Sequence, residues 1–220
     1  LCDLITRGFR DNRYRDRAEI KPEWLQTEDN QGLILLSGAH LGDVGQALLA
    51  GNTALAEQRA HAWQAAFPHA FYLELQRTGD ATVETCVQAS AALAEKLAIP
   101  AVATHPIQFM EPDDFMAHEA RTCIADGYVL ADKRRPKNFT QSQYFLSTAE
   151  MQALFADMPE ALRNTVEIAK RCNLSIQLGK SFLPDFPTPD GMGIDAFLIA
   201  QAEEGLQKRM AILYPDESIR

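Results

Sequence analysis

The residues best placed for chemistry are polar side chains that directly follow a predicted strand near position 100. The stretch PAVATHPIQFM runs from Pro100 to Met110, and it opens with small and β-branched residues before it breaks at His105. In open α/β sheets and in barrels, active sites lie at the carboxyl ends of such strands. A metal-dependent hydrolase would place acids and histidines there, whereas this stretch offers His105, Pro106 and Gln108. The sequence therefore poses the question of whether an active site or only its remnant is present.

Two further candidates follow earlier predicted strands. Glu74 lies on the strand face opposite Leu73 and Leu75, where it could bind a metal or a substrate, but a solvent-facing or hydrogen-bonded polar residue is the favoured interpretation. His40 lies in SGAHLGDVG, a Gly-rich turn that could hold a phosphate on helix N–H groups. Its spacing is neither GxGxxG nor that of a P-loop. The glycines are therefore better explained by a tight strand-to-helix turn.

One basic cluster, made of Lys133, Arg134, Arg135 and Lys137, stands out in an acidic chain. It could contact DNA phosphates or an acidic partner. Because the formal net charge is −9, a solvated loop is the favoured interpretation, and binding of nucleic acid by charge alone is not expected.

Length and composition indicate one large domain, or one domain with a piece of another, in a chain of 220 residues with 46% hydrophobic residues. The four cysteines form no CxxC pair, which suits a reducing compartment and predicts a cytoplasmic protein. No apolar run is long enough to span a bilayer, so no membrane contact is expected. The first residues, LCDLITRGF, resemble the middle of a helix, and we expect a fragment of a longer protein.

The predicted elements would place the candidate residues at one edge of a sheet. Strands are expected at 33–37, 71–76 and 101–104, with helices beginning near Asn52 and Thr82 between them. Strand–helix units repeated about every 30 residues are typical of parallel βαβ crossovers. The fold class predicted is therefore α/β, with a helical C-terminal part.

That C-terminal part carries clear helix signals. A helix over 113–126 should end at Gly127, and Ser147 with Glu150 forms a capping box. The other expected segments are a charge-rich, partly helical connector over 9–23, a helix from Pro159 with Leu162, Val166, Ala169 and Cys172 at helical spacing, a strand over 174–178, a Pro- and Gly-rich connector over 182–193, and an amphipathic helix over 194–213.

Six strings carry a family resemblance, in this order: GLILLSGAHLGDVG, FYLELQRTG, PAVATHPIQF, AHEARTCIADG, LADKRRPKNF and PEALRNTVEIAKRCN. Together they resemble the polymerase-and-histidinol-phosphatase (PHP) domain of bacterial replicative DNA polymerases, over nearly all of the chain. The resemblance implies a distorted barrel related to the TIM barrel, here partial. The HxH and Asp-His motifs that metal-binding members carry near the start of the domain do not occur.

The resemblance also implies a degenerate metal site. Metal-binding members carry Cys after Ser-Gly, where this chain has Ala39, and Asn-Asp-Val-His where it has HPIQ at 105–108. Proline offers no donor atom and a neutral amide is a poor ligand for zinc or manganese. Glu74 would stand alone. We therefore expect no catalytic residue, metal or cofactor in the chain, and we regard Ala39, Glu74, Pro106 and Gln108 as vestigial positions.

The same resemblance implies an organisation and partners. Residues 1–181 would be the PHP domain without its first strands, 182–193 a connector, and 194–220 the start of the polymerase palm. The parent would be a DNA-directed DNA polymerase that uses Mg²⁺, binds DNA and carries its catalytic carboxylates beyond Arg220. The domain would support the polymerase core, a proofreading exonuclease subunit and other holoenzyme subunits. An open sheet would favour a truncation-induced homodimer.

Two alternatives remain open. The first is an active metal-dependent phosphoesterase or pyrophosphatase of the PHP family, against which Ala39, Pro106 and Gln108 argue. The second is an unrelated TIM-like enzyme that shares only the βαβ spacing, against which the six ordered strings argue.

Overall fold

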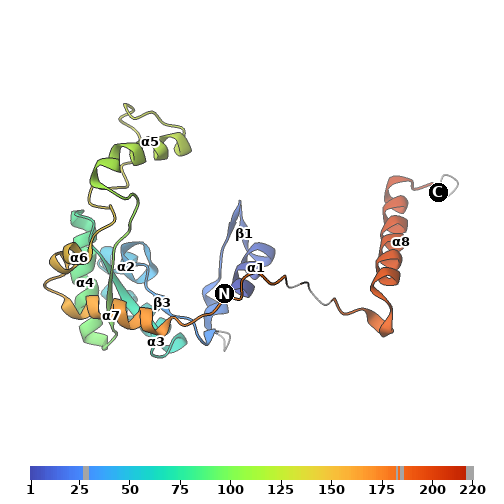
Figure 1. Ribbon diagram of the computed structural model, residues 1–220, viewed down its shortest axis with the longest axis horizontal. Coiled ribbons are helices and arrows are strands. Elements are labelled where there is room, and N and C mark those ends of the chain that lie inside the picture. Colours follow the sequence, from blue (N-terminus) through green and yellow to red (C-terminus); the bar gives the residue numbers. More distant parts are fainter. Residues whose placement is uncertain (27–29, 182, 184–185, 217–220) are drawn as a thin grey trace. The chain divides into compact units, whose positions relative to one another are not determined.

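The computed structural model describes residues 1–26, 30–181, 183 and 186–216, and these form two compact units, 1–173 and 174–220. The first unit contains a parallel sheet with strand order β3-β4-β5 (Figure 1). The strands are β3 (Leu35–Leu36), β4 (Phe71–Gln76) and β5 (Ala101–Thr104). The predicted parallel βαβ arrangement is therefore confirmed.

Helices join these strands as predicted, with one correction. Helices α2 (Asp43–Leu49) and α3 (Thr53–Ala66) connect β3 to β4, and α4 (Ala81–Leu97) connects β4 to β5. The side chain of Asn52 accepts a hydrogen bond from the Leu55 N–H at 3.1 Å, which confirms the expected N-cap of α3. The cap of α4 is Asp80 instead of Thr82, because its carboxylate accepts two N–H groups of the first turn.

Two apolar clusters hold the sheet to its helices. In the first, Ala56 and Ala60 of α3 are fully buried with Phe71 and Leu73 of β4. The second cluster joins Leu75 of β4 and Ala103 of β5 to Phe155, just after helix α6 (Thr148–Leu154), and to Ala161 of helix α7 (Pro159–Arg171). Small residues on the helices let the backbone approach the strands closely.

Arg77, just after β4, fixes the α6–α7 junction to the sheet. Its guanidinium donates to both carboxylate oxygens of Glu84 on α4 and to both of Asp157 between α6 and α7. It also donates to the Leu154 carbonyl oxygen and stacks over the Phe155 ring at 5.0 Å. A half-buried arginine satisfied in this way is a strong tertiary contact.

The connector predicted over 9–23 is partly helical, as expected, but it also contains a hairpin. Helix α1 (Cys2–Asp11) agrees with the helical character of LCDLITRGF. It is followed by an antiparallel pair, β1 (Arg13–Tyr14) and β2 (Arg17–Ala18), and by the 3-10 helix η1 (Pro22–Gln26). The sequence analysis missed this hairpin.

The later helices of the first unit agree better with the predictions. The segment expected over 113–126 is a short 3-10 helix, η4 (Pro112–Asp114), followed by α5 (Phe115–Asp126), and Gly127 ends it in the left-handed conformation with φ of 74°. The capping box of Ser147 and Glu150 begins α6 as expected.

One expected strand is absent. The segment 174–178 is not a strand, and its Leu174 and Leu178 side chains are 86% and 85% exposed. Helix α7 forms as predicted, with Val166 within it and Cys172 just after it both exposed. The strand predicted over 33–37 is shorter, since β3 contains only Leu35 and Leu36, and both are half-buried.

The architecture is mixed α/β, but the described residues form an open three-stranded sheet and not a closed barrel. The TIM-like barrel is therefore not confirmed. The second unit contains η5 (Pro189–Gly191) and α8 (Ile194–Leu213), as predicted for 194–213. Residues 182, 184–185 and 217–220, within the expected connector and palm segments, lie outside the described residues. Within the described residues, no helix has both the length and the apolar character needed to cross a bilayer.

Candidate functional site at the strand ends

A cleft of about 550 Å³ lies at the carboxyl ends of the parallel strands. His40 after β3, Gln76 and Asp80 at the end of β4 and Gln108 after β5 line it, together with Lys137 from the basic loop. The structure therefore brings two of the candidates, His40 and Gln108, together with polar residues that follow β4, as the ends of parallel strands should. Several polar side chains therefore converge on this cleft.

The turn that carries His40 is shaped by close backbone approaches. A Cβ atom on Gly42 would lie 1.7 Å from the Ser37 carbonyl oxygen, and one on Gly45 would lie 2.0 Å from that of Ala39. Neither position can hold a side chain without moving the main chain. The glycines are thus explained by the tight turn, which was the favoured interpretation of SGAHLGDVG.

Ala39 cannot contribute to a site by its chemistry. It is buried, with 5% of its surface exposed, and its φ of 47° is in the left-handed region. The methyl group offers no donor or acceptor atom.

Glu74 is engaged inside the sheet. Its Oε1 accepts hydrogen bonds from the Thr104 hydroxyl of β5 and from Gln76 Nε2, the latter at 3.0 Å. Its backbone N–H donates to Ser37 Oγ at 2.9 Å, so that all three strand segments are linked at this point. Glu74 is half-buried and does not line the cleft. It is the hydrogen-bonded polar residue that the sequence analysis favoured.

The HPIQ segment is held by backbone and side-chain hydrogen bonds to the loop before α6. The Gln108 N–H donates to the Gln143 carbonyl oxygen at 2.8 Å, and Gln143 Nε2 donates to the Pro106 carbonyl oxygen at 3.1 Å. His105 Nε2 lies 2.9 Å from the Ser142 carbonyl oxygen, so this nitrogen carries the proton. The segment is therefore built to fix a loop, and Pro106 and Gln108 line the cleft.

The predicted basic cluster does not act as four equivalent cations. Arg135 forms an ion pair with Glu119 of α5, in which the two side chains are 12% and 4% exposed. Arg134 is 85% exposed and binds Asp132 at 2.8 Å. Among the described residues no ion pair is recorded for Lys133 or Lys137. These two remain the candidates for contact with DNA or a partner.

Two further polar groups lie at or near the cleft. Asp80 lines it, and hydrogen bonds from the backbone N–H groups of Val83 and Thr82 hold its pKa below the ordinary value. His118 of α5 is buried against Phe139, with ring centroids 4.6 Å apart, and its Nδ1 accepts from Arg121 at 3.0 Å. Burial, and then the charge of Arg121, lowers the pKa of His118. Sequence analysis missed Asp80, although an Asp between a strand and a helix was a usable signal. His118 has no second histidine three or four residues away, so the sequence favours no helical metal pair there.

The donor set can now be compared with what a metal centre needs. Within the described residues, no group of three or more His, Cys, Asp or Glu side chains is arranged to hold a metal ion. Zinc sites use three or four such ligands. The cleft itself presents carboxylate, imidazole, amide, hydroxyl and ammonium groups, among them Asp80, His40 and Lys137.

Comparison with known proteins shows which proteins this chain resembles. The PHP domain profile matches residues 1–78. DNA polymerase III subunit alpha of Neisseria meningitidis serogroup A is 56% identical over 222 residues, which are 100% of this chain and 19% of the relative. The chain is homologous along its whole length to a segment of DNA polymerase III subunit alpha. The Escherichia coli K12 subunit is 49% identical over 220 residues, and that of Pseudomonas fluorescens 47% over 218, covering 100% and 99% of this chain and 19% and 18% of the relatives.

The resemblance to the replicative polymerase PHP domain is thereby confirmed. The chain spans about a fifth of the length of the alpha subunits it matches, 19% for the Neisseria protein. The profile of the PHP domain ends at Thr78, before β5 and the HPIQ segment. The domain boundaries expected at 181 and 193 remain predictions.

Proposed function

We propose that this chain is a non-catalytic PHP scaffold within a replicative DNA polymerase alpha subunit, a DNA-directed DNA polymerase of the nucleotidyltransferase class. The observation that supports the proposal most directly is that the Glu74 carboxylate accepts hydrogen bonds from Thr104 and Gln76 within the sheet. The other vestigial positions add no anionic or imidazole ligand, because Ala39 and Pro106 lack donor atoms and Gln108 is a neutral amide.

The partners follow from the same family. The scaffold would hold the proofreading exonuclease subunit, support the polymerase core with other holoenzyme subunits, and work in the cytoplasm. The whole protein would bind DNA and use Mg²⁺ in its palm. Lys133 and Lys137, for which no ion pair is recorded among the described residues, would be the contacts to DNA or to an acidic partner.

The scaffold function is tested by binding to the purified exonuclease subunit of the same organism. The full-length alpha subunit and the exonuclease should co-elute in size-exclusion chromatography at micromolar concentration. Loss of co-elution after replacement of the PHP segment by that of an unrelated PHP phosphatase would support the proposal. Unchanged co-elution would place the exonuclease site elsewhere and overturn it.

A second candidate function is an active phosphoesterase or pyrophosphatase. One observation favours it: the cleft of about 550 Å³ keeps His40, Asp80 and Lys137 together at the strand ends. Elemental analysis after chelation and reconstitution separates the two functions. One or more tightly held zinc or manganese ions per chain, lost on Glu74→Ala or His105→Ala substitution, would favour the enzyme.

A further inference from the structure

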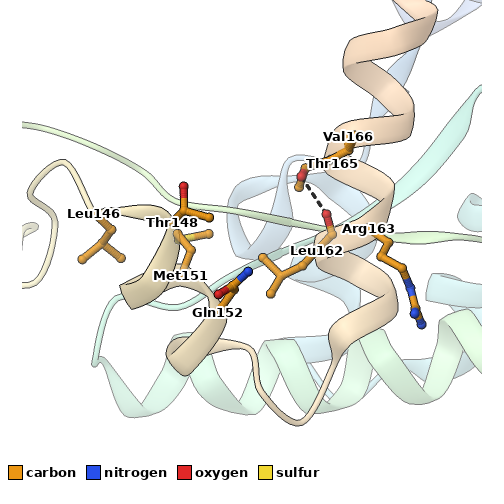
Figure 2. A pocket seen from close by; sticks show the side chains of 8 residues that line it. All are labelled: Leu146, Thr148, Met151, Gln152, Leu162, Arg163, Thr165 and Val166. Atoms are coloured by element: carbon orange, nitrogen blue, oxygen red, sulfur yellow. Dashed lines mark hydrogen bonds between the residues drawn. The ribbon is translucent and has the colours of Figure 1, made fainter.

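Two apolar hollows lie side by side on the first unit, and Leu146 lines both. We call the pair the Leu146 surface. The first hollow, about 370 Å³, lies between α6 and α7, where Met151 and Leu162 project into the space between the two helices (Figure 2). Val166 of α7 also lines it and is 54% exposed.

The second hollow, about 470 Å³, lies on the other side of Leu146, against the turn after β4. Its apolar walls include Ala153 and Leu154 of α6, and Tyr144 and Glu150 also line it. Both volumes fall within the roughly 300–1,000 Å³ typical of ligand sites. Two apolar hollows that share Leu146 form a candidate interaction site.

Negative charges outnumber positive charges beside the second hollow. Arg77 is only 11% exposed, and its single positive charge is matched by two carboxylates, Glu84 and Asp157, which are 44% and 52% exposed. Glu150 adds a third carboxylate. Hydrogen bonds from Tyr144 and Ser147 lower the pKa of Glu150 to about 2, so it stays ionised.

Beside the first hollow the charges cancel. Arg163 lines it and donates to Glu160 Oε2 at 3.0 Å, and both side chains are exposed. The Leu146 surface is therefore apolar in its two hollows and acidic beside the second one. We call that acidic side, with Glu150, Glu84 and Asp157, the Glu150 border. A complementary occupant needs apolar side chains and at least one cation.

We propose that the Leu146 surface docks a segment of a partner protein that carries apolar anchor residues beside Lys or Arg. The apolar side chains enter the two hollows, and the cation lies against the Glu150 border. A second copy of this chain is a poor occupant, because it would bring a net charge of −9 to an acidic border. The inference rests on the proposed scaffold function, since it specifies a surface and a chemistry by which such a scaffold binds.

Synthetic probe peptides test the chemistry directly. Fluorescence anisotropy is measured with the full-length protein and three labelled pentapeptides of sequence Leu-Lys-Phe-Leu-Lys, Leu-Glu-Phe-Leu-Glu and Ser-Lys-Ser-Ser-Lys. The first should bind, and each of the others should bind at least about 10-fold more weakly, because each lacks one of the two complementary features. Rising salt should weaken the first peptide.

Substitutions locate the site. Glu150→Gln keeps a residue that can complete the capping box, and Val166→Ser alters an exposed position, so both variants should fold. Each should weaken the first peptide about 3-fold or more. Glu95→Gln, which removes an exposed carboxylate near the far end of α4, is the matched control and should have no effect.

Three outcomes would overturn the proposal. They are equal binding of the Lys and Glu peptides, binding that neither substitution changes, and no binding at all. Self-association in analytical ultracentrifugation that Val166→Ser abolishes would make a second copy the occupant and would also overturn it. Because the peptides test the surface and the exonuclease tests the scaffold, failure of one is distinguishable from failure of the other.

Discussion

The guanidinium of Arg135 lies against the carboxylate of Glu119, and both side chains are almost fully enclosed. In the sequence Arg135 belongs to a cluster of cations, but in the fold it closes the loop over α5. Glu119 is buried and Arg135 supplies its counter-charge. A residue that looks available for DNA is thus committed to the structure.

Removal of one partner of this pair should destabilise the fold. Arg135→Ala leaves a buried carboxylate unpaired, and we expect a loss of about 3 kcal/mol in the free energy of unfolding. Lys133→Ala, two residues away, should change it by about 0.5 kcal/mol or less. Urea denaturation of the two variants measures the difference. Equal stability of both would show that the pair is not structural, whereas a double change, Glu119→Gln with Arg135→Met, should recover most of the loss.

Acid should destabilise the first unit through His118. Burial lowers the pKa of His118 in the folded state. As the pH falls through about 6.5, the imidazole is therefore protonated in the unfolded chain before it is protonated in the folded chain. This stabilising contribution is fully present above about pH 6.5 and is lost as the pH falls from there through the folded pKa, by at most about 1.4 kcal/mol per pH unit. Denaturation at pH 7.5 and 5.5 should show a larger loss for the wild type than for His118→Gln. Parallel losses in the two proteins would refute the role of this imidazole.

Gly42 should tolerate alanine less well than Gly127, although only Gly127 has a positive φ. The φ of Gly42 is −73°, which any residue adopts, but a Cβ there meets the Ser37 carbonyl oxygen. We expect Gly42→Ala to cost roughly 2–4 kcal/mol, because main chain has to move. Gly127→Ala, at φ of 74° in open space, should cost roughly 1–2 kcal/mol. Thermal denaturation ranks the two variants, and the reverse order would contradict the backbone clash.

Glu74 should matter for stability and not for metal content. Glu74→Gln keeps an oxygen that accepts from Thr104, so its effect should be small. Glu74→Ala leaves Thr104 and Gln76 without their acceptor and should cost about 1–3 kcal/mol. Calorimetry gives the stabilities, and elemental analysis of the same samples should show equal zinc and manganese contents. A metal content that falls only in the two variants would restore Glu74 as a ligand.

Local signals account for what the sequence predicted well. The Asn52 cap, the capping box at Ser147 and Gly127 at a helix end depend on neighbours within a few residues, and all three occur in the structure. The run of small and β-branched residues at 101–104 has the same bounds as β5.

Non-local contacts account for the rest. The hairpin at 13–18 turns at Arg15 with φ of 53°, where no glycine or asparagine marks it. The alternation at 174–178 predicted a strand, but a strand needs a neighbour, and none of the described strands pairs with it. The Arg135–Glu119 pair joins residues 16 positions apart, and no spacing rule would select Glu119 from the acidic residues of the chain.

Arg77 and its partner Asp157 are far apart in the sequence, and this separation fixes the order in which their region can fold during protein synthesis. Its acceptor Asp157 follows it by 80 residues, so the ribosome releases β4 and α4 well before the α6–α7 junction exists. In that interval Arg77 has only Glu84 as an acidic partner, and the apolar surface that later receives Phe155 is uncovered. Closure of this contact is therefore a late step, and the nascent sheet is most open to aggregation and to chaperone binding just before it.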